Sequence, residues 1–136
     1  MDIDSRLEQG VFLLGDMSLC RVYLKDNGDY PWLVLVPMVK GTTEIYQLSS
    51  TQQALLMNDV THASKMIQSC FINIEKINVA SLGNIVSQLH VHVVGRRCDD
   101  PLWPHAIWQA NLQPNPYQQP EKWVCRLKEL LGVDIF

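Results

Sequence analysis

The sequence of 136 residues contains few charged residues and little clustering of basic ones. Lys, Arg, Asp and Glu make up 18% of it, and the formal net charge is −3; an average soluble domain has ~25% charged residues. The longest basic cluster is the pair Arg96-Arg97, whereas general nucleic-acid binding requires an extended basic surface. We therefore expect a small-molecule partner and no nucleic acid.

The sequence also lacks a hydrophobic run of the ~18 residues that a membrane span needs. Its longest apolar run, 32–39, is interrupted by Pro37. The first residues, 1–6, lack the basic and apolar regions of a signal peptide. The four cysteines are scattered without a CxxC pair, which favours free thiols in a reducing compartment over disulfides. We expect a cytoplasmic protein without a membrane partner.

Hydrophobic residues make up 47% of the sequence, which excludes a disordered or fibrous protein. The length fits one domain, because domains cluster at roughly 100–150 residues. We therefore expect a single domain over 1–136 with its core at about 10–110. Five of the seven prolines lie within 101–120, so we expect an irregular arm over 99–120 and a C-terminal helix over 120–132.

The N-terminal part of the sequence predicts a short helix and a strand hairpin. The helix is expected over 4–9, closed by Gly10. Strand-forming residues fill 19–25 and 32–36, and the Asn-Gly pair at 27–28 is the strongest short signal for a hairpin turn. An antiparallel pair of strands follows from this pattern.

A long amphipathic helix is expected over 49–70. Ser50 and Gln53 match a capping box at its start. Apolar residues then recur at helical spacing, which predicts one buried stripe against a sheet; its members are Leu56, Val60, Ala63, Ile67 and Cys70.

Two further strands are expected over 76–82 and 88–96, linked by a tight turn at 83–84. With the C-terminal helix, the order of elements is a helix, several strands, a helix, two strands and a helix. This order predicts the α+β class with an antiparallel sheet.

The segment most informative about chemistry is Gln88-Leu-His-Val-His-Val-Val-Gly-Arg-Arg97. Side chains alternate between the faces of a strand, so Gln88, His90 and His92 share one face. The two imidazoles then stand roughly 7 Å apart at ~3.3 Å per residue. This arrangement is a row of ring nitrogens on a rigid strand.

The residues alone leave three interpretations of this row open. The first is an exposed strand face with two incidental histidines. The second is a metal site, which would need further ligands such as Cys98 or His105. The third is nucleophilic catalysis, in which one ring nitrogen attacks phosphorus while the other donates its proton to a fixed acceptor.

Residues 88–94 resemble the signature of the histidine triad (HIT) family, His-φ-His-φ-His-φ-φ, in which φ is an apolar residue. The stretch 77–88 is similar to the strand and phosphate-binding turn before that signature, and 30–37 is similar to its upstream strand. Residues 100–104 with Trp108 are similar to a bacterial subgroup described as diadenosine tetraphosphate hydrolase-like. The resemblance covers about residues 10–110.

This resemblance implies an α+β fold with an antiparallel sheet of about five strands, a long helix and a C-terminal helix. HIT proteins are usually homodimers that share a sheet across the interface. The implied activity is hydrolysis or transfer at the α-phosphate of diadenosine polyphosphates or related adenylated compounds, which makes the chain a phosphoric anhydride hydrolase. No metal or other cofactor is implied, although a divalent cation can accompany a polyphosphate.

The site residues carry over by position. The resemblance makes His90 the nucleophile that forms a nucleotidyl-histidine intermediate, and it places His92 against the phosphate and the leaving group. Gln88 occupies the first triad position. The substrate-binding candidates that it implies are Asn78, Asn84, Ser87, Asp26, Asn27 and Leu24.

Gln88 is also a departure from the family pattern, because the first triad residue is otherwise histidine. Glutamine can hydrogen-bond a phosphate or orient a neighbour, but it carries no proton near neutral pH. Two hypotheses remain open: an enzyme that works with Gln88, and a nucleotide-binding or regulatory module that has lost turnover.

Five residues around the signature carry weaker expectations. Arg96 and Arg97 either neutralise a polyphosphate or are solvated charges at a strand end. Trp103 and Trp108 either pack on the partner subunit or lie near the substrate, and a packing role is the favoured expectation. His105 lies in the arm, either near the site or exposed.

Overall fold

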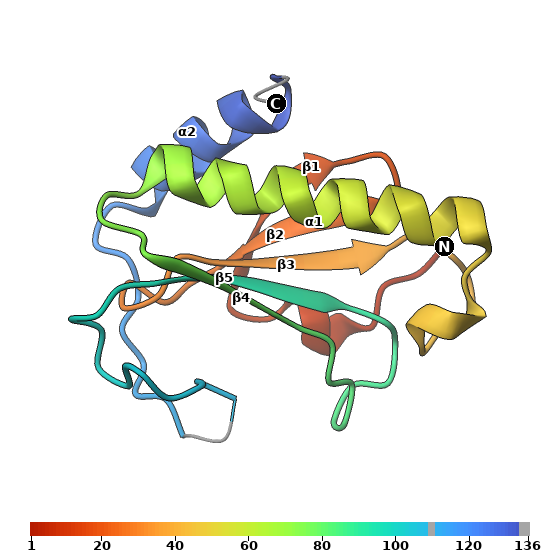
Figure 1. The fold of residues 1–136 in the computed structure, drawn as a ribbon, viewed down its shortest axis with the longest axis horizontal. Coiled ribbons are helices and arrows are strands. Elements are labelled where there is room, and N and C mark those ends of the chain that lie inside the picture. Colours follow the sequence, from red (N-terminus) through yellow and green to blue (C-terminus); the bar gives the residue numbers. More distant parts are fainter. Residues whose placement is uncertain (109–110, 134–136) are drawn as a thin grey trace.

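The computed structural model describes residues 1–108 and 111–133 and has a five-stranded sheet at its centre (Figure 1). The strands lie in the order β1-β2-β3-β5-β4, and every neighbouring pair is antiparallel. Their bounds are β1 Val11–Asp16, β2 Cys20–Lys25, β3 Trp32–Pro37, β4 Lys76–Ala80 and β5 Val91–Arg96. The predicted α+β class with an antiparallel sheet is confirmed.

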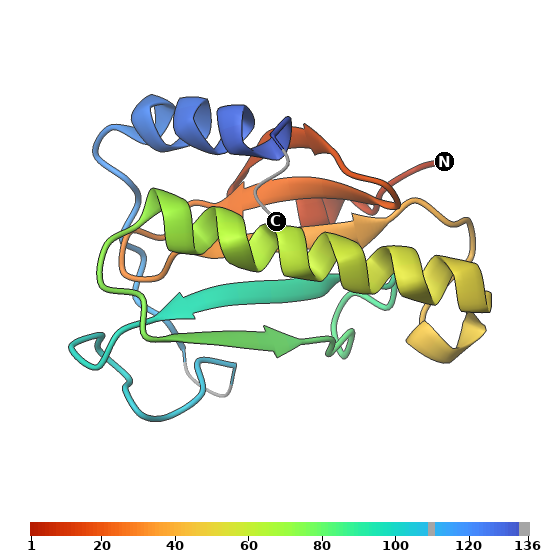
Figure 2. The same ribbon diagram turned by 45° about the horizontal axis from the view of Figure 1, so that its top comes forward.

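Two α-helices cover one face of the sheet (Figure 2). The long helix α1, Ser50–Cys70, crosses β3 and β5, and the C-terminal helix α2, Pro120–Leu131, packs on β1 and α1. Two short 3₁₀ helices, η1 at Ser5–Glu8 and η2 at Ile45–Gln47, complete the described elements. None of the helices in the described ranges is long and apolar enough to cross a membrane.

The stripe predicted on α1 packs against the sheet. Leu56, Val60, Ala63 and Ile67 are buried in the core, and Cys70 is partly buried. The helix lies close to β5 at Gly95, where a Cβ atom would lie 2.7 Å from Cγ2 of Ile67. Any larger residue at this position would therefore displace the helix.

The capping box of α1 lies one residue earlier than predicted. The Ser49 hydroxyl accepts a hydrogen bond from the Gln52 N–H at 3.1 Å, and the Gln52 side chain accepts one from the Ser49 N–H at 2.9 Å. The Ser-x-x-Gln pattern occurs twice in succession here, so spacing alone could not choose between the two. Strands β4 and β5 are also shorter than predicted, and His90 directly precedes β5.

The opposite face of the sheet is covered by η1 and by the arm that follows β5 (Figure 1). A second apolar cluster fills this layer, and its buried members include Leu7, Trp32, Val34, Val94 and Ile107. The histidines of the signature lie on this face, so the site is built between the sheet and two irregular segments.

Arg96 is buried in this layer, with 1% of its surface exposed, and it is not a solvated charge. Its guanidinium donates to both carboxylate oxygens of Asp100 at 2.7 and 2.9 Å, and to the side-chain oxygen of Asn78 at 2.9 Å. The rings of Tyr30 and Trp103 lie beside it, with centroids 5.7 and 5.8 Å from Cζ. The prediction failed because the burial of Arg96 depends on the arm, which has no regular pattern in the sequence.

The Asp100 carboxylate organises the start of the arm. It accepts hydrogen bonds from the backbone N–H groups of Arg97 and Leu102 as well as from Arg96. Burial by itself raises the pKa of Asp100, but these hydrogen bonds outweigh burial, and the pKa lies below its usual value. The carboxylate is therefore charged under all ordinary conditions.

Replacing Asp100 with alanine should destabilise the fold by about 3–5 kcal/mol, because it leaves the buried Arg96 guanidinium without its counter-charge. The matched control is Asp16→Ala, which breaks the exposed ion pair with Arg21 and should cost at most about 1 kcal/mol. Urea unfolding of the two variants would measure both values. Equal, small losses would show that the Arg96 pair does not anchor the arm.

Candidate active site

The rings of His90 and His92 lie side by side on the sheet face opposite α1 and α2. Their centroids are 5.0 Å apart and the rings meet edge to face. His92 lies on β5 and pairs with Val34 of β3, whereas His90 is the last residue before β5. The alternation of side chains along the segment therefore brings the two imidazoles together as expected.

His90 is held by the backbone of its own segment. Only 7% of the residue is exposed, and its Nδ1 lies 2.7 Å from the carbonyl oxygen of Gln88. A carbonyl oxygen can only accept a hydrogen bond, so Nδ1 carries the proton. Nε2 of the neutral ring then has a free lone pair, which is the state that a nucleophilic histidine requires.

His92 has the opposite arrangement. Its Nδ1 is 3.0 Å from the indole nitrogen of Trp32, and an indole N–H can only donate. Nδ1 therefore accepts, and the proton of the neutral ring lies on Nε2. Burial, with smaller contributions from the charges of His90 and Lys25, lowers the pKa of His92 to about 4.

Trp108 of the arm completes the surroundings of His92. Its ring lies 5.3 Å from the His92 ring and 6.0 Å from the Trp32 ring. The amine of Lys25 lies 5.6 Å from the centroid of the Trp32 ring. Two indoles and a cation therefore surround the second histidine.

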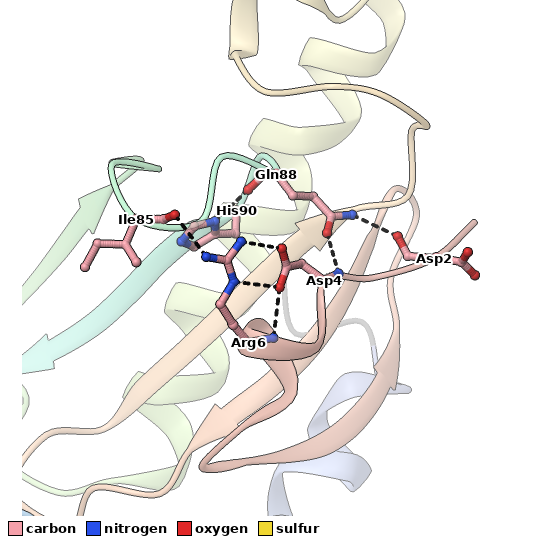
Figure 3. Close-up of polar contacts among 6 residues, drawn as sticks. All are labelled: Asp2, Asp4, Arg6, Ile85, Gln88 and His90. Atoms are coloured by element: carbon pink, nitrogen blue, oxygen red, sulfur yellow. Dashed lines mark hydrogen bonds and ion pairs between the residues drawn. The ribbon is translucent and has the colours of Figure 1, made fainter.

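The side chain of Gln88 points away from His90 and towards the N-terminal segment, residues 2–6 (Figure 3). Its oxygen accepts a hydrogen bond from the Asp4 N–H at 2.7 Å, and its nitrogen donates to the Asp2 carbonyl at 3.2 Å. The backbone carbonyl of Gln88 holds His90 at the same time. The first triad position thus has two contacts, one through its backbone and one through its side chain.

The N-terminal segment also brings a cation to the site. Arg6 donates twice to the Asp4 carboxylate, at 3.0 and 2.8 Å, and a third nitrogen lies 3.5 Å from the Ile85 carbonyl (Figure 3). Ile85 belongs to the loop that leads into the histidines. Sequence reasoning missed this segment because about 80 residues separate it from the loop, and no local pattern links them.

Three of the predicted binding residues lie on β4 or in the loop after it. Asn78 directs its side-chain oxygen to Arg96. Asn84 and Ser87 are exposed in the loop between β4 and β5, and Ser87 and Gln88 border a cavity of about 570 Å³. Lys40 and Thr43 also line that cavity.

The three predicted hairpin residues are divided between the two faces. Leu24 is fully buried in the core beneath the helices, so the sheet separates it from the histidines. Asp26 and Asn27 border a cavity of about 410 Å³ together with Lys25 and Trp32. The Asp26 carboxylate also accepts a hydrogen bond from the Tyr117 N–H at 2.9 Å. Asn27, which is buried, accepts one from the Asp29 N–H at 2.9 Å.

Among the residues that the structure describes, no three His, Cys, Asp or Glu side chains are grouped as a metal site would require. The two further ligands considered from the sequence, Cys98 and His105, are both exposed outside the histidine pair. Arg97 pairs with Asp99 at 3.0 Å in solvent.

Comparison with known proteins agrees with this geometry. A family model of the HIT domain matches residues 6–99. Solved histidine triad proteins from Bradyrhizobium japonicum and Marinobacter aquaeolei VT8 are similar along nearly the whole chain. The first is 34% identical with a TM-score of 0.88, covering 96% of this chain and 97% of its own. The second is 37% identical with a TM-score of 0.88, covering 96% and 95%.

A third histidine triad protein, from Sinorhizobium meliloti 1021, is 35% identical with a TM-score of 0.86, covering 94% of this chain and 95% of its own. No curated protein matches the chain. The family model and these three structures together establish the family. The chain belongs to the HIT domain family, whose members are nucleotide-binding hydrolases and transferases.

Proposed function

We propose that this protein is a nucleotide hydrolase or transferase that cleaves at the α-phosphate of diadenosine polyphosphates or related adenylated compounds. The observation that carries the proposal is the state of His90. Its Nδ1 proton is held by the Gln88 carbonyl at 2.7 Å, which leaves the Nε2 lone pair available. The adjacent His92 supplies a proton-bearing nitrogen for the phosphate oxygens.

The proposed reaction has two steps. In the first, Nε2 of His90 attacks the α-phosphorus, the bond from phosphorus to the leaving oxygen breaks, and that oxygen takes the electron pair. The ring becomes cationic, and the Gln88 carbonyl stabilises it through the retained Nδ1–H. In the second step water attacks the same phosphorus, the phosphorus–Nε2 bond breaks and its electron pair returns to the ring. The proton of the water passes to solvent, and the nucleotide and neutral His90 are released.

The environment of Gln88 favours phosphoanhydride substrates. The amide of Gln88 has no acidic proton and is bound to Asp2 and Asp4. A polyphosphate leaves as a stable anion and needs little protonation, whereas an amine leaving group must be protonated. Diadenosine polyphosphates therefore suit this site better than phosphoramidates.

Two cavities border residues that hold the histidines: Trp32 lines one and Gln88 lines the other. We place the nucleoside in the 410 Å³ cavity beside Trp32 and Asp26, and the remainder of the substrate in the 570 Å³ cavity beside Ser87. The reaction requires no resident metal, although a divalent cation can accompany the polyphosphate. All four cysteines are free thiols, which fits the proposed cytoplasmic location.

We further propose a homodimer formed along the edge strand β4. This strand has a neighbour on one side only, and Val79 on it is 50% exposed. Next to it, Ile45, Met57 and Val79 border an apolar cavity of about 620 Å³ between α1 and the sheet. A second copy could extend the sheet and cover these side chains.

Replacing His90 with alanine should reduce turnover of diadenosine tetraphosphate by at least about a thousandfold, because it removes the nucleophile. The matched control is His62→Gln on α1, across the sheet from the site, which should leave the rate unchanged. Both rates are measurable by chromatography of the nucleotide products. Nucleotide binding without turnover in the wild type would instead support the non-catalytic module.

Replacing Gln88 with alanine should reduce turnover by less than about tenfold, because the carbonyl that holds His90 remains. The loss of two hydrogen bonds, each worth about 0.5–1.5 kcal/mol, should instead loosen the N-terminal segment. Hydrogen exchange at the Asp4 amide should therefore speed up while the rate changes little. A loss of turnover as large as that of His90→Ala would contradict this separation between the backbone and side-chain roles of Gln88.

The substitution Val79→Glu should convert the proposed dimer to a monomer, because it places a charge in an apolar interface. Val133→Glu is a matched control, since Val133 is exposed to nearly the same extent, 51% against 50%, but lies after α2. Sedimentation velocity would show whether each variant is a dimer or a monomer. Dimers that survive Val79→Glu would place the interface elsewhere.

A further inference from the structure

Trp32, which lines the cavity proposed for the nucleoside, also contacts the second histidine of the site. It is the first residue of β3, it is 8% exposed, and it lies on the sheet face that carries the histidines. Trp32 pairs with Val94, so His92 is its diagonal neighbour on β5. A long aromatic side chain can span a diagonal of this kind.

The contact between the two side chains has a fixed direction. The indole nitrogen of Trp32 is 3.0 Å from Nδ1 of His92, and this nitrogen is a donor with no lone pair to accept. An Nδ1–H tautomer of His92 would bring two donors face to face. The contact is therefore compatible only with a neutral ring whose proton is on Nε2.

The tautomer of His90 is selected by a partner of the opposite kind. Its Nδ1 meets a carbonyl oxygen, an acceptor, which selects the Nδ1–H tautomer. Two adjacent histidines are thus held in opposite tautomers by partners of opposite kind. His90 presents a lone pair on its Nε2, whereas His92 presents a proton on its own Nε2.

We infer that Trp32 is a positioning residue that fixes the proton of His92 on Nε2 and so makes His92 a permanent hydrogen-bond donor to the phosphate beside His90. This role deepens the proposed function and rests on it for its catalytic consequence. The tautomer itself is a property of the free protein and can be observed without turnover.

The other groups around His92 support a neutral ring. The titratable and charged groups that act on it are His90, from its own segment, and Lys25 from β2. The arm contributes the uncharged Trp108, and Ala80 is its partner on β4. A positive charge on His92 is disfavoured by the nearby ammonium of Lys25.

The test uses the whole protein labelled with ¹⁵N in its histidines. In the wild type we expect His92 to show a single Nε2–H tautomer from pH 8 down to about 5, because its pKa is about 4. In Trp32→Phe the donor is gone, so we expect a mixture of the two neutral tautomers, while burial continues to hold the pKa of His92 below its ordinary value. The matched control, Trp108→Phe, removes the other indole at His92 and should leave the Nε2–H tautomer in place.

Function is followed in two ways on the same variants. Single-turnover cleavage of diadenosine tetraphosphate should slow by about ten- to a hundredfold in Trp32→Phe, the loss expected for one hydrogen bond to a charged group. The affinity for inorganic phosphate should fall together with the rate, and this probe does not occupy the nucleoside cavity that Trp32 also lines.

The outcomes separate the two proposals. An Nδ1–H tautomer of His92 in the wild type, or an unchanged tautomer in Trp32→Phe, would overturn the role of Trp32. If the wild type cleaves no adenylated compound, the hydrolase proposal fails, and the tautomer and the affinity for inorganic phosphate still decide whether Trp32 positions His92. Lys25→Met provides a second variant that keeps the indole, and it should raise the His92 pKa without changing the tautomer.

Discussion

The buried guanidinium of Arg96 connects the parts of the molecule that surround the site. It joins β5 to β4 through Asn78 and to the arm through Asp100. The Asp100 carboxylate in turn fixes the first turn of the arm through two backbone N–H groups. Because the same arm brings Trp108 to His92, an ion pair that contacts no reacting atom determines the shape of the site. Its bidentate geometry and full set of partners offset the cost of burying two charges.

The chemistry of the site depends on hydrogen-bond partners more than on the histidines themselves. An isolated imidazole exchanges its proton between two nitrogens and titrates near neutral pH. The Gln88 carbonyl and the Trp32 indole each remove that freedom, in opposite senses. The result is a nucleophile next to a donor, made from two copies of the same side chain. Fixing both before substrate arrives avoids a cost of reorganisation during the reaction.

The sequence predicted the parts of the molecule that repeat locally. The alternation of residues 88–96 placed the histidines on one face, and the helical stripe from Leu56 to Ile67 packs as expected. It failed where a contact joins distant segments without a regular pattern. The burial of Arg96 depends on the arm, and the partner of Gln88 lies more than 80 residues away. Leu24 shows a second kind of error, since this residue next to the expected binding hairpin faces the opposite side of the sheet.

The first triad position contains two separable contacts, and this explains how a glutamine can occupy it. Every residue type has the backbone carbonyl that orients His90, so the substitution leaves that contact intact. The side chain is then free to serve another purpose. A primary amide has an acceptor and a donor next to each other, and here they meet a backbone N–H and a backbone carbonyl of the N-terminal segment. Glutamine thus gives up a titratable proton and gains a link to the N-terminal segment, which borders the same cavity.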